Sequence, residues 1–250
     1  QRAAPLDACE LEALYPTRFE TLQTLRFNPD SRAVETAGER RFAAIVLERR
    51  TVPTARNAAT ARMLMRGILD LGLDCLPWTE ALRAWQTRVC CLRAWCPDLG
   101  LPDVSDAALA DTAEDWLAPL LAGCLRVADL DAAAFAQALR AHLDYAQQRT
   151  LDEQAPVEIE VPSGMRRRLQ YAPDGSPVLA VKLQEMFGLA DTPRIARGRV
   201  AVTLHLLSPR QTPIQVTQDL RGFWERTYPD VKKELKGRYP KHPWPDDPWT

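Results

Sequence analysis

Apolar residues recur at short intervals in the first fifty residues, a pattern that predicts β-strands. The segment RFETLQTLRF carries its apolar side chains at Phe19, Leu22, Leu25 and Phe27. The NPDS run at 28–31 has proline and aspartate where a tight turn favours them. Two more short strands are expected around Gly38, and the apolar run 42–47 is expected to be a buried strand. Three consecutive antiparallel strands fit a meander that forms part of a small barrel or sheet.

The apolar spacing becomes helical over residues 56–153. The first stripe recurs at helical intervals and consists of Ala61, Leu64, Met65, Ile68 and Leu71. Later helices are expected to begin near Thr79, at Ser105 with Asp106, at Asp131, and at Asp144, which forms a capping box with Gln147. The helix that begins at Ser105 with Asp106 should point Leu109, Ala113, Trp116, Leu117 and Leu120 inward. Tryptophan and methionine stripes at this spacing are typical of a helical core rather than of a cofactor site.

The pattern is mixed over residues 156–250. Strands are expected at 157–161, 165–171, 199–207 and 214–216. Ser176 and Pro177 suit the start of a helix that would run to Phe187. Two more helices are expected, one capped by Thr217 and one that begins at Pro229. The predicted fold class is therefore α+β, with a truncated, OB-like β-barrel segment, a helical connector and a small mixed α/β module at the C-terminus.

Composition supports a folded globular protein. The 250 residues are 46% hydrophobic and 26% charged, with a net charge of −1. The charge is distributed unevenly, because residues from Arg194 onward hold eleven basic and six acidic side chains. The C-terminal third is therefore the part best suited to meet an anion.

Cysteine usage favours reduced thiols and a cytoplasmic location. Six cysteines occur, three of them in VCCLRAWC, without a CxxC pair or a Cys/His set at zinc spacing. No metal site is expected. The sequence has no apolar run of 18 residues, so no membrane span is expected, and no signal peptide opens it. The first residue is not methionine, which indicates a piece of a larger protein.

Motifs for several kinds of catalysis are missing from the sequence. It has no GxxxxGK[ST] phosphate loop, no GxGxxG after a strand, no GxSxG elbow and no HExxH. His242 with Asp246 and Asp247 could form an acid/base group of a stand-alone hydrolase. Their proline-rich surroundings favour a packing role instead, so no catalytic residue is predicted.

Two arginine clusters are the candidate binding residues. Arg166, Arg167 and Arg168 are consecutive on a predicted strand, so Arg167 should face away from its neighbours. The RIARGR segment adds Arg194, Arg197 and Arg199. If both predicted strands share a sheet, their guanidinium groups could hold phosphates of nucleic acid. The alternative is that the charges protect an edge strand against aggregation.

The last residues, GRYPKHPWPDDPWT, cannot form a helix interior or a central strand because of their four prolines. We expect this segment to be a strap on its own module. The strap would pack Tyr239 and Trp244 against aromatic surface from Trp224 and Tyr228. A polyproline ligand for another protein and a disordered tail are the alternatives.

Several segments together resemble the HrpB-type ATP-dependent helicases of bacteria. The most specific is IQVTQDLRGFWERTYPDVKKELKGRYPKHPWPDDP, and VPSGMRRRLQYAPDGSPVLAVKLQEMFGLADTPRIARGRVAVTLHLLSP fits the same family. Two earlier segments, DCLPWTEALRAWQTRVCCLRAW and ELEALYPTRFETLQTLRFNPDSRAV, also fit. The resemblance covers nearly the whole chain in order.

The resemblance implies a position after the ATPase core of a DEAH-box-like RNA helicase. Residues 1–52 would be the end of an OB-like accessory domain, 53–155 a helical connector, and 156–250 a family-specific module. No catalytic residue of the family matches a position here, so ATP and Mg²⁺ would belong to the missing core. The expected role is to orient nucleic acid, such as single-stranded RNA, or to dock a partner for that core. The alternative is a protein–protein interaction module without RNA contact.

Overall fold

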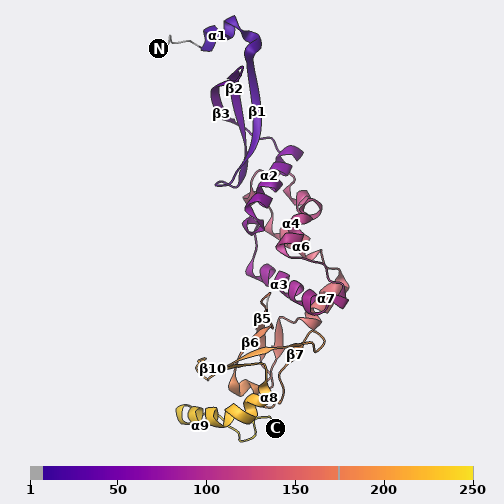
Figure 1. Cartoon of the computed structure of the whole chain (residues 1–250), viewed down its shortest axis with the longest axis vertical. Coiled ribbons are helices and arrows are strands. Elements are labelled where there is room, and N and C mark those ends of the chain that lie inside the picture. Colours follow the sequence, from indigo (N-terminus) through magenta and orange to yellow (C-terminus); the bar gives the residue numbers. More distant parts are fainter. Residues whose placement is uncertain (1–7, 174, 250) are drawn as a thin grey trace. The chain divides into compact units, whose positions relative to one another are not determined.

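The computed structural model describes residues 8–173 and 175–249 (Figure 1). Contacts divide the chain into a first unit, residues 1–79 with 106–141, and a second unit, residues 80–105 with 142–250. The sequence predicted a different division, into segments 1–52, 53–155 and 156–250. That division describes modules of the family and stays a prediction. The described residues do not include residues 1–7 and Thr250, which are the two ends of the expected segments. They also do not include Asp174, which belongs to a predicted turn.

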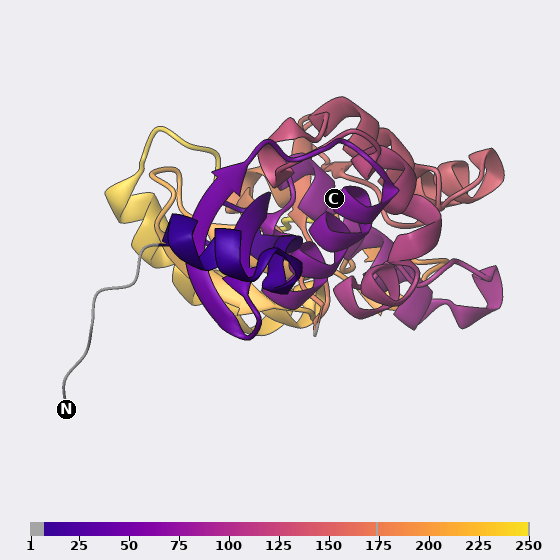
Figure 2. The same ribbon diagram turned by 90° about the horizontal axis from the view of Figure 1, so that it is seen from above.

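A three-stranded antiparallel sheet dominates the start of the first unit. It follows helix α1 (Ala8–Leu14) and contains, in order, β1 (Phe19–Asn28), β2 (Ala33–Phe42) and β3 (Ile45–Val52). Figure 1 shows these strands side by side, and Figure 2 views the same sheet from above. The predicted meander is thus confirmed. These described strands form no closed barrel, so the OB-like assignment stays a prediction.

The strand boundaries in this sheet differ from the prediction. Gly38 lies in the middle of β2, opposite Gln23 of β1, and does not separate two strands. The predicted buried strand 42–47 instead spans the turn between β2 and β3, and Ile45 is 62% exposed. Ala43 adopts a left-handed φ of 50° in that turn. The apolar run 42–47 was misleading because β2 and β3 pair as a long hairpin. The turn of that hairpin lies inside the run.

The helices of the first unit pack around a small aromatic core. They are α2 (Ala58–Leu71), α4 (Asp106–Asp111), α5 (Ala113–Trp116) and α6 (Ala132–Arg140). Asp131 accepts hydrogen bonds from the backbone of Ala133 and Ala134, as a predicted cap should. Phe135 is fully buried between Trp78 and Trp116. The single helix expected after Ser105 is instead broken at Thr112 and ends in a 3₁₀ turn, where Pro119 cannot continue the α-helical hydrogen bonds.

Two helices open the second unit, α3 (Glu80–Trp95) and α7 (Tyr145–Gln154). Asp144 and Gln147 form the predicted capping box at the start of α7. Arg88 of α3 is 7% exposed and donates a 2.7 Å hydrogen bond to the carbonyl of Ala155, just past the end of α7. A buried guanidinium therefore ties the end of α7 to the middle of α3.

A five-stranded sheet forms the body of the second unit. Its order is β10 (Pro213–Thr217), β9 (Thr203–Leu207), β6 (Val178–Lys182), β5 (Arg166–Gln170) and β4 (Glu158–Glu160). Strands β6 and β9 pair in parallel, whereas the other neighbours are antiparallel. A separate two-stranded hairpin contains β7 (Arg194–Ile195) and β8 (Val200–Ala201). The α+β class is thus confirmed.

The helix predicted for 176–187 is wrong, because β6 occupies its first half. Leu179 and Val181 are buried in the middle of the sheet, and a 3₁₀ turn from Leu183 to Met186 follows. The Ser-Pro pair is a good helix start, but β-branched and aliphatic residues that alternate in burial favour a central strand. Pairing on both sides with β5 and β9 outweighed the local signal.

The C-terminal helices form one continuous run of α8 (Leu220–Gly222), a wider π-type turn (Phe223–Thr227) and α9 (Tyr228–Arg238). Asp219 caps α8 through a 2.8 Å hydrogen bond from the backbone of Gly222, so Thr217 is not the cap. The Thr217 hydroxyl instead accepts a hydrogen bond from the backbone of Asp219. Within the described residues, no helix combines the length and apolar character that crossing a membrane requires.

Candidate functional site

The segment from Arg194 to Ala201, which we call the arginine hairpin, is held in one conformation by its backbone. Ala196, Arg197 and Gly198 adopt left-handed φ angles of 53°, 56° and 76°, which bring β7 back into β8. Gln154 at the end of α7 anchors the loop. Its backbone carbonyl accepts from the N–H of Ala196 at 2.9 Å and its side-chain carbonyl from the N–H of Arg197 at 2.7 Å. Three arginines are thus presented from a fixed turn.

The arginine hairpin carries more positive than negative charge. Arg197 and Arg199 both bind the carboxylate of Asp98, which follows α3 in the sequence. Arg194 instead donates to the backbone carbonyls of Gly198 at 2.6 Å and Arg199 at 3.1 Å. Hydrogen bonding from Arg199 holds the pKa of Asp98 below its usual range, so the carboxylate stays ionised at neutral pH. In the described part of the chain, the carboxylate of Asp98 therefore pairs with two of these three guanidinium groups.

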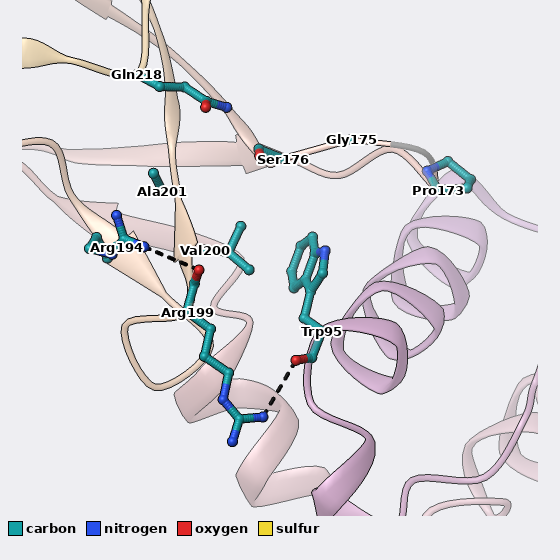
Figure 3. A pocket seen from close by; sticks show the side chains of 9 residues that line it. All are labelled: Trp95, Pro173, Gly175, Ser176, Arg194, Arg199, Val200, Ala201 and Gln218. Carbon is teal, nitrogen blue, oxygen red and sulfur yellow. Dashed lines mark hydrogen bonds between the residues drawn. The ribbon is translucent and has the colours of Figure 1, made fainter.

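A pocket of about 600 Å³ borders the arginine hairpin. Its lining includes Trp95, Ser176, Arg194, Arg199, Val200 and Gln218. Figure 3 shows the indole ring of Trp95 pointing from the end of α3 towards the space that Ser176 and Gln218 border. Arg199 also donates to the backbone carbonyl of Trp95, at 3.5 Å. The pocket therefore combines two cations, two neutral polar side chains and one aromatic ring.

The other arginine cluster lies elsewhere in the second unit and is more nearly neutralised. Strand β5 places Arg166 opposite Glu160 and Arg168 opposite Glu158 of β4. Arg167 makes two hydrogen bonds to Glu185, at 2.5 and 2.7 Å. Strand β5 lies between β4 and β6, but its register with β6 pairs only Leu169 and Gln170, so protection of a sheet edge by the arginines stays an alternative. The clusters lie on different sheets, and none of these three arginines lines the Trp95 pocket.

The proline-rich C-terminal segment, residues 239–249, lies on the helices that precede it. Trp244 is 8% exposed, and its ring meets that of Phe187 edge-on. Phe187 also contacts the rings of Trp224 and Tyr228 at centroid distances of 6.0 Å. The hydroxyl of Tyr228 donates a 3.0 Å hydrogen bond to the carbonyl of Pro245, and burial raises the pKa of Tyr228 to about 12.

Further polar contacts hold the same segment. The backbone N–H of Gly188 donates to the carbonyl of Pro248 at 2.8 Å, and Lys232 forms an ion pair with Asp246. The indole of Trp244 donates to the carbonyl of Tyr239 at 3.0 Å. We call residues 239–249 the strap. Its contacts combine an aromatic anchor with hydrogen bonds along its length.

The histidine group considered for catalysis is not assembled for that task. His242 is exposed and its ring contacts that of Tyr239. Asp246 is bound to Lys232, and hydrogen bonding from Lys232 lowers the pKa of Asp246. Among the residues that the structure describes, no group of three or more His, Cys, Asp or Glu could hold a metal ion.

Sequence reasoning selected the arginines but missed Trp95 and Asp98. Asp98 lies about a hundred positions before Arg197 and Arg199, so local patterns could not pair them. Trp95 fell in a helix whose tryptophans were assigned to the core. One signal in the sequence could have identified Trp95. It is the last residue of its helix, and a side chain at a helix end need not point into the buried face of the helix.

Replacing Arg88 by methionine is expected to lower the free energy of unfolding of the second unit by about 1.5–3 kcal/mol. Methionine keeps much of the volume but leaves the carbonyl of Ala155 without its donor. Urea unfolding followed by circular dichroism measures the change. Arg93→Met on the same helix is the matched control, because Arg93 is half-exposed and pairs with Asp103 at 3.4 Å. Equal effects of the two variants would contradict the role given to Arg88.

Comparisons with known proteins converge on one group. A family model described as "ATP-dependent helicase C-terminal" matches residues 116–248. The chain is 45% identical over 185 residues to the "ATP-dependent RNA helicase HrpB" of Escherichia coli strain K12. That alignment covers 74% of this chain and 23% of the relative, so the chain spans about a quarter of the relative's length.

Solved structures give the same result. The crystal structure of the E. coli DExH-box NTPase HrpB matches with a TM-score of 0.77 and 36% identity, over 98% of this chain and 30% of that one. The crystal structure of the Escherichia coli DEAH/RHA helicase HrpB matches with a TM-score of 0.67 and 34% identity. This second match covers 91% of this chain and 29% of that one.

Proposed function

Because the chain belongs to the C-terminal family of HrpB-type ATP-dependent helicases, we propose that it orients single-stranded RNA for the ATPase core of its full-length protein. The E. coli relative is an RNA helicase by name. The parent would couple ATP hydrolysis to movement on RNA or to its remodelling. The parent would be located in the cytoplasm. The first partner of the present chain would be the ATPase core of the same protein.

ATP and Mg²⁺ are assigned to that core and not to these residues. Nucleotide binding by such enzymes uses a phosphate loop and acidic metal ligands. The 250 residues contain no GxxxxGK[ST] run, and the described residues contain no cluster of three metal-ligating side chains. The proposal therefore places nucleotide binding in the core. Under the same proposal, the sheet of β1, β2 and β3 is the end of an OB-like accessory domain whose other strands precede it.

The arginine hairpin is the observation that carries the proposed RNA contact. It presents Arg194, Arg197 and Arg199 from a turn that Gln154 anchors, with the carboxylate of Asp98 against the last two. Guanidinium groups bind phosphate oxygens through two parallel hydrogen bonds, and a fixed turn lowers the entropy lost on binding. Arg166 and Arg168, which are exposed but face acidic residues, stay a secondary prediction.

A second candidate function is docking of another protein without RNA contact. Its support is a pocket of about 420 Å³ in the first unit, which includes Ala58, Ala61, Met65, Ala118 and Ala122. Arg56 and Arg62 also line it. A partner protein that presents an apolar side chain next to an acidic one would suit this pocket, because the apolar lining would contact the first and the arginines the second.

The 250-residue chain is expected to bind a single-stranded oligouridylate with an affinity that falls steeply as salt rises. For single strands, the slope of log K against log salt is about −0.7 per neutralised phosphate. Joint replacement of Arg194 and Arg199 by glutamine should reduce the steepness by about 1.4 if each binds one phosphate. Fluorescence anisotropy at several salt concentrations measures both slopes.

The matched control replaces Arg210 and Lys241 by glutamine, because both are exposed and lie outside the Trp95 pocket. This control should keep the wild-type slope. Absence of salt-sensitive RNA binding by the wild-type chain would remove the proposed function and favour the docking of a protein.

A further inference from the structure

We propose that the Trp95 pocket takes one nucleotide of the RNA strand, with its base stacked on the indole ring and its phosphate held by the arginine hairpin. This inference rests on the proposed function and names the chemical group that occupies the same site. The pocket volume of about 600 Å³ lies inside the range of roughly 300–1,000 Å³ typical of small-ligand sites. A single extruded nucleotide is a ligand of that class.

Trp95 differs from four of the tryptophans that serve the core. Trp85 is also without an indole partner among the described residues, but it is buried, whereas Trp95 lines the pocket. The indole N–H groups of Trp78, Trp116, Trp224 and Trp244 each donate to a backbone carbonyl within the fold. Within the described ranges, the indole N–H of Trp95 makes no such bond, and the ring is only half-buried. A tryptophan that lines a pocket with its polar group unused offers both a stacking surface and a donor.

Neutral polar groups stand where the edge of a stacked base would lie. The side-chain amide nitrogen of Gln218 donates to the hydroxyl of Thr203 at 2.8 Å, and the described residues supply no donor to its side-chain carbonyl oxygen. Ser176 adds a hydroxyl on the same wall of the pocket (Figure 3). An amide and a hydroxyl can bond to the edges of bases, whereas a phosphate alone would not need them.

The cations lie beside the ring, as a nucleotide requires. Arg194 and Arg199 line the pocket together with Trp95, and Arg199 bonds to the backbone of Trp95. Arg194 uses two donors on backbone carbonyls of the arginine hairpin, and a guanidinium has five. Its remaining donors are available for a phosphate. Because Arg197 belongs to the same hairpin, the phosphates of neighbouring nucleotides can continue along it.

The test compares RNA with a backbone that lacks bases. The 250-residue chain is titrated with an oligouridylate and with a ribose-phosphate oligomer of equal length and no bases. Wild type should bind the oligouridylate about 5- to 150-fold more tightly than the abasic oligomer. Trp95→Leu should remove most of that difference, and Trp95→Phe should keep most of it. An oligomer containing 2-aminopurine should be quenched by wild type and less by Trp95→Leu.

Tyr145→Leu is the matched control, because Tyr145 is an aromatic residue of the second unit that is 85% exposed and lies outside the pocket. Equal affinity of wild type for the two oligomers would overturn the stacked base, whether or not Trp95→Leu folds. Salt-sensitive binding that depends on Arg194 and Arg199 but not on Trp95 would overturn the inference and leave the proposed function standing. Tight binding of uridine monophosphate alone would also overturn it, because the ligand would then be a free nucleotide.

Discussion

Replacing Trp244 by alanine is expected to lower the free energy of unfolding of the second unit by about 3–5 kcal/mol. Trp244 is the aromatic anchor of the strap, and its ring meets Phe187, which also contacts Trp224 and Tyr228. The alanine variant loses that buried surface and the hydrogen bond from the indole to Tyr239. Urea unfolding followed by tryptophan fluorescence measures the shift, because Trp224 lies in the same cluster.

Lys241→Ala is the matched control within the strap. Lys241 is exposed, so its replacement should change the free energy of unfolding by no more than about 0.5 kcal/mol. Removal of residues 239–250 should destabilise the unit at least as much as Trp244→Ala. An unchanged midpoint and an unchanged emission of the remaining tryptophans after that removal would show that the strap does not hold the helices. A loosely attached ligand segment for another protein would then be the better interpretation.

The aromatic residues and prolines of the strap allowed it to be predicted from the sequence. The residue on which it packs could not be predicted. Proline excluded a helix, and tryptophans without aliphatic neighbours indicated packing against a nearby surface. Phe187 was expected at the end of a helix and instead follows the 3₁₀ turn after β6. That error hid the residue on which Trp224, Tyr228 and Trp244 converge. A wrong element type therefore removed the central contact from the prediction.

Helices with strong local signals were predicted best. The capping box of Asp144 with Gln147 and the cap at Asp131 depend on neighbours within three residues, so the sequence contains the whole interaction. The stripe of Leu64, Met65 and Ile68 is likewise buried on one face of α2. Elements that depend on distant strands were predicted less well. Strand β6 is an example, because its parallel partner β9 lies more than twenty residues away.

The candidate site shows the same limit. Three arginines within six residues are obvious in the sequence, and the family resemblance gave them a context. Their charge balance depends on Asp98 and their rigidity on Gln154, and both come from another part of the chain. The other arginine cluster looked stronger in the sequence because its members are consecutive. Cross-strand glutamates and Glu185 reduce its excess charge, which only the strand register could show.

Replacing Phe135 by alanine is expected to lower the free energy of unfolding of the first unit by about 3–5 kcal/mol. Phe135 is fully buried on α6. Its ring meets that of Trp78 edge-on at 5.2 Å and that of Trp116 at 6.0 Å, so alanine leaves a cavity between two large rings. The hydrogen bonds that both indoles make to backbone carbonyls restrict how far the rings can move to fill it. Urea unfolding followed by circular dichroism measures the loss.

Gln137→Ala on the same helix is the matched control, because Gln137 is exposed and alanine is a good helix former. It should change the free energy of unfolding by no more than about 0.5 kcal/mol. Phe135→Leu should lie between the two, since leucine keeps part of the buried volume. If Phe135→Ala unfolds at the same urea concentration as Gln137→Ala, the three rings do not form the core of the first unit. The helices α2 and α6 would then have to be held by their aliphatic stripes alone.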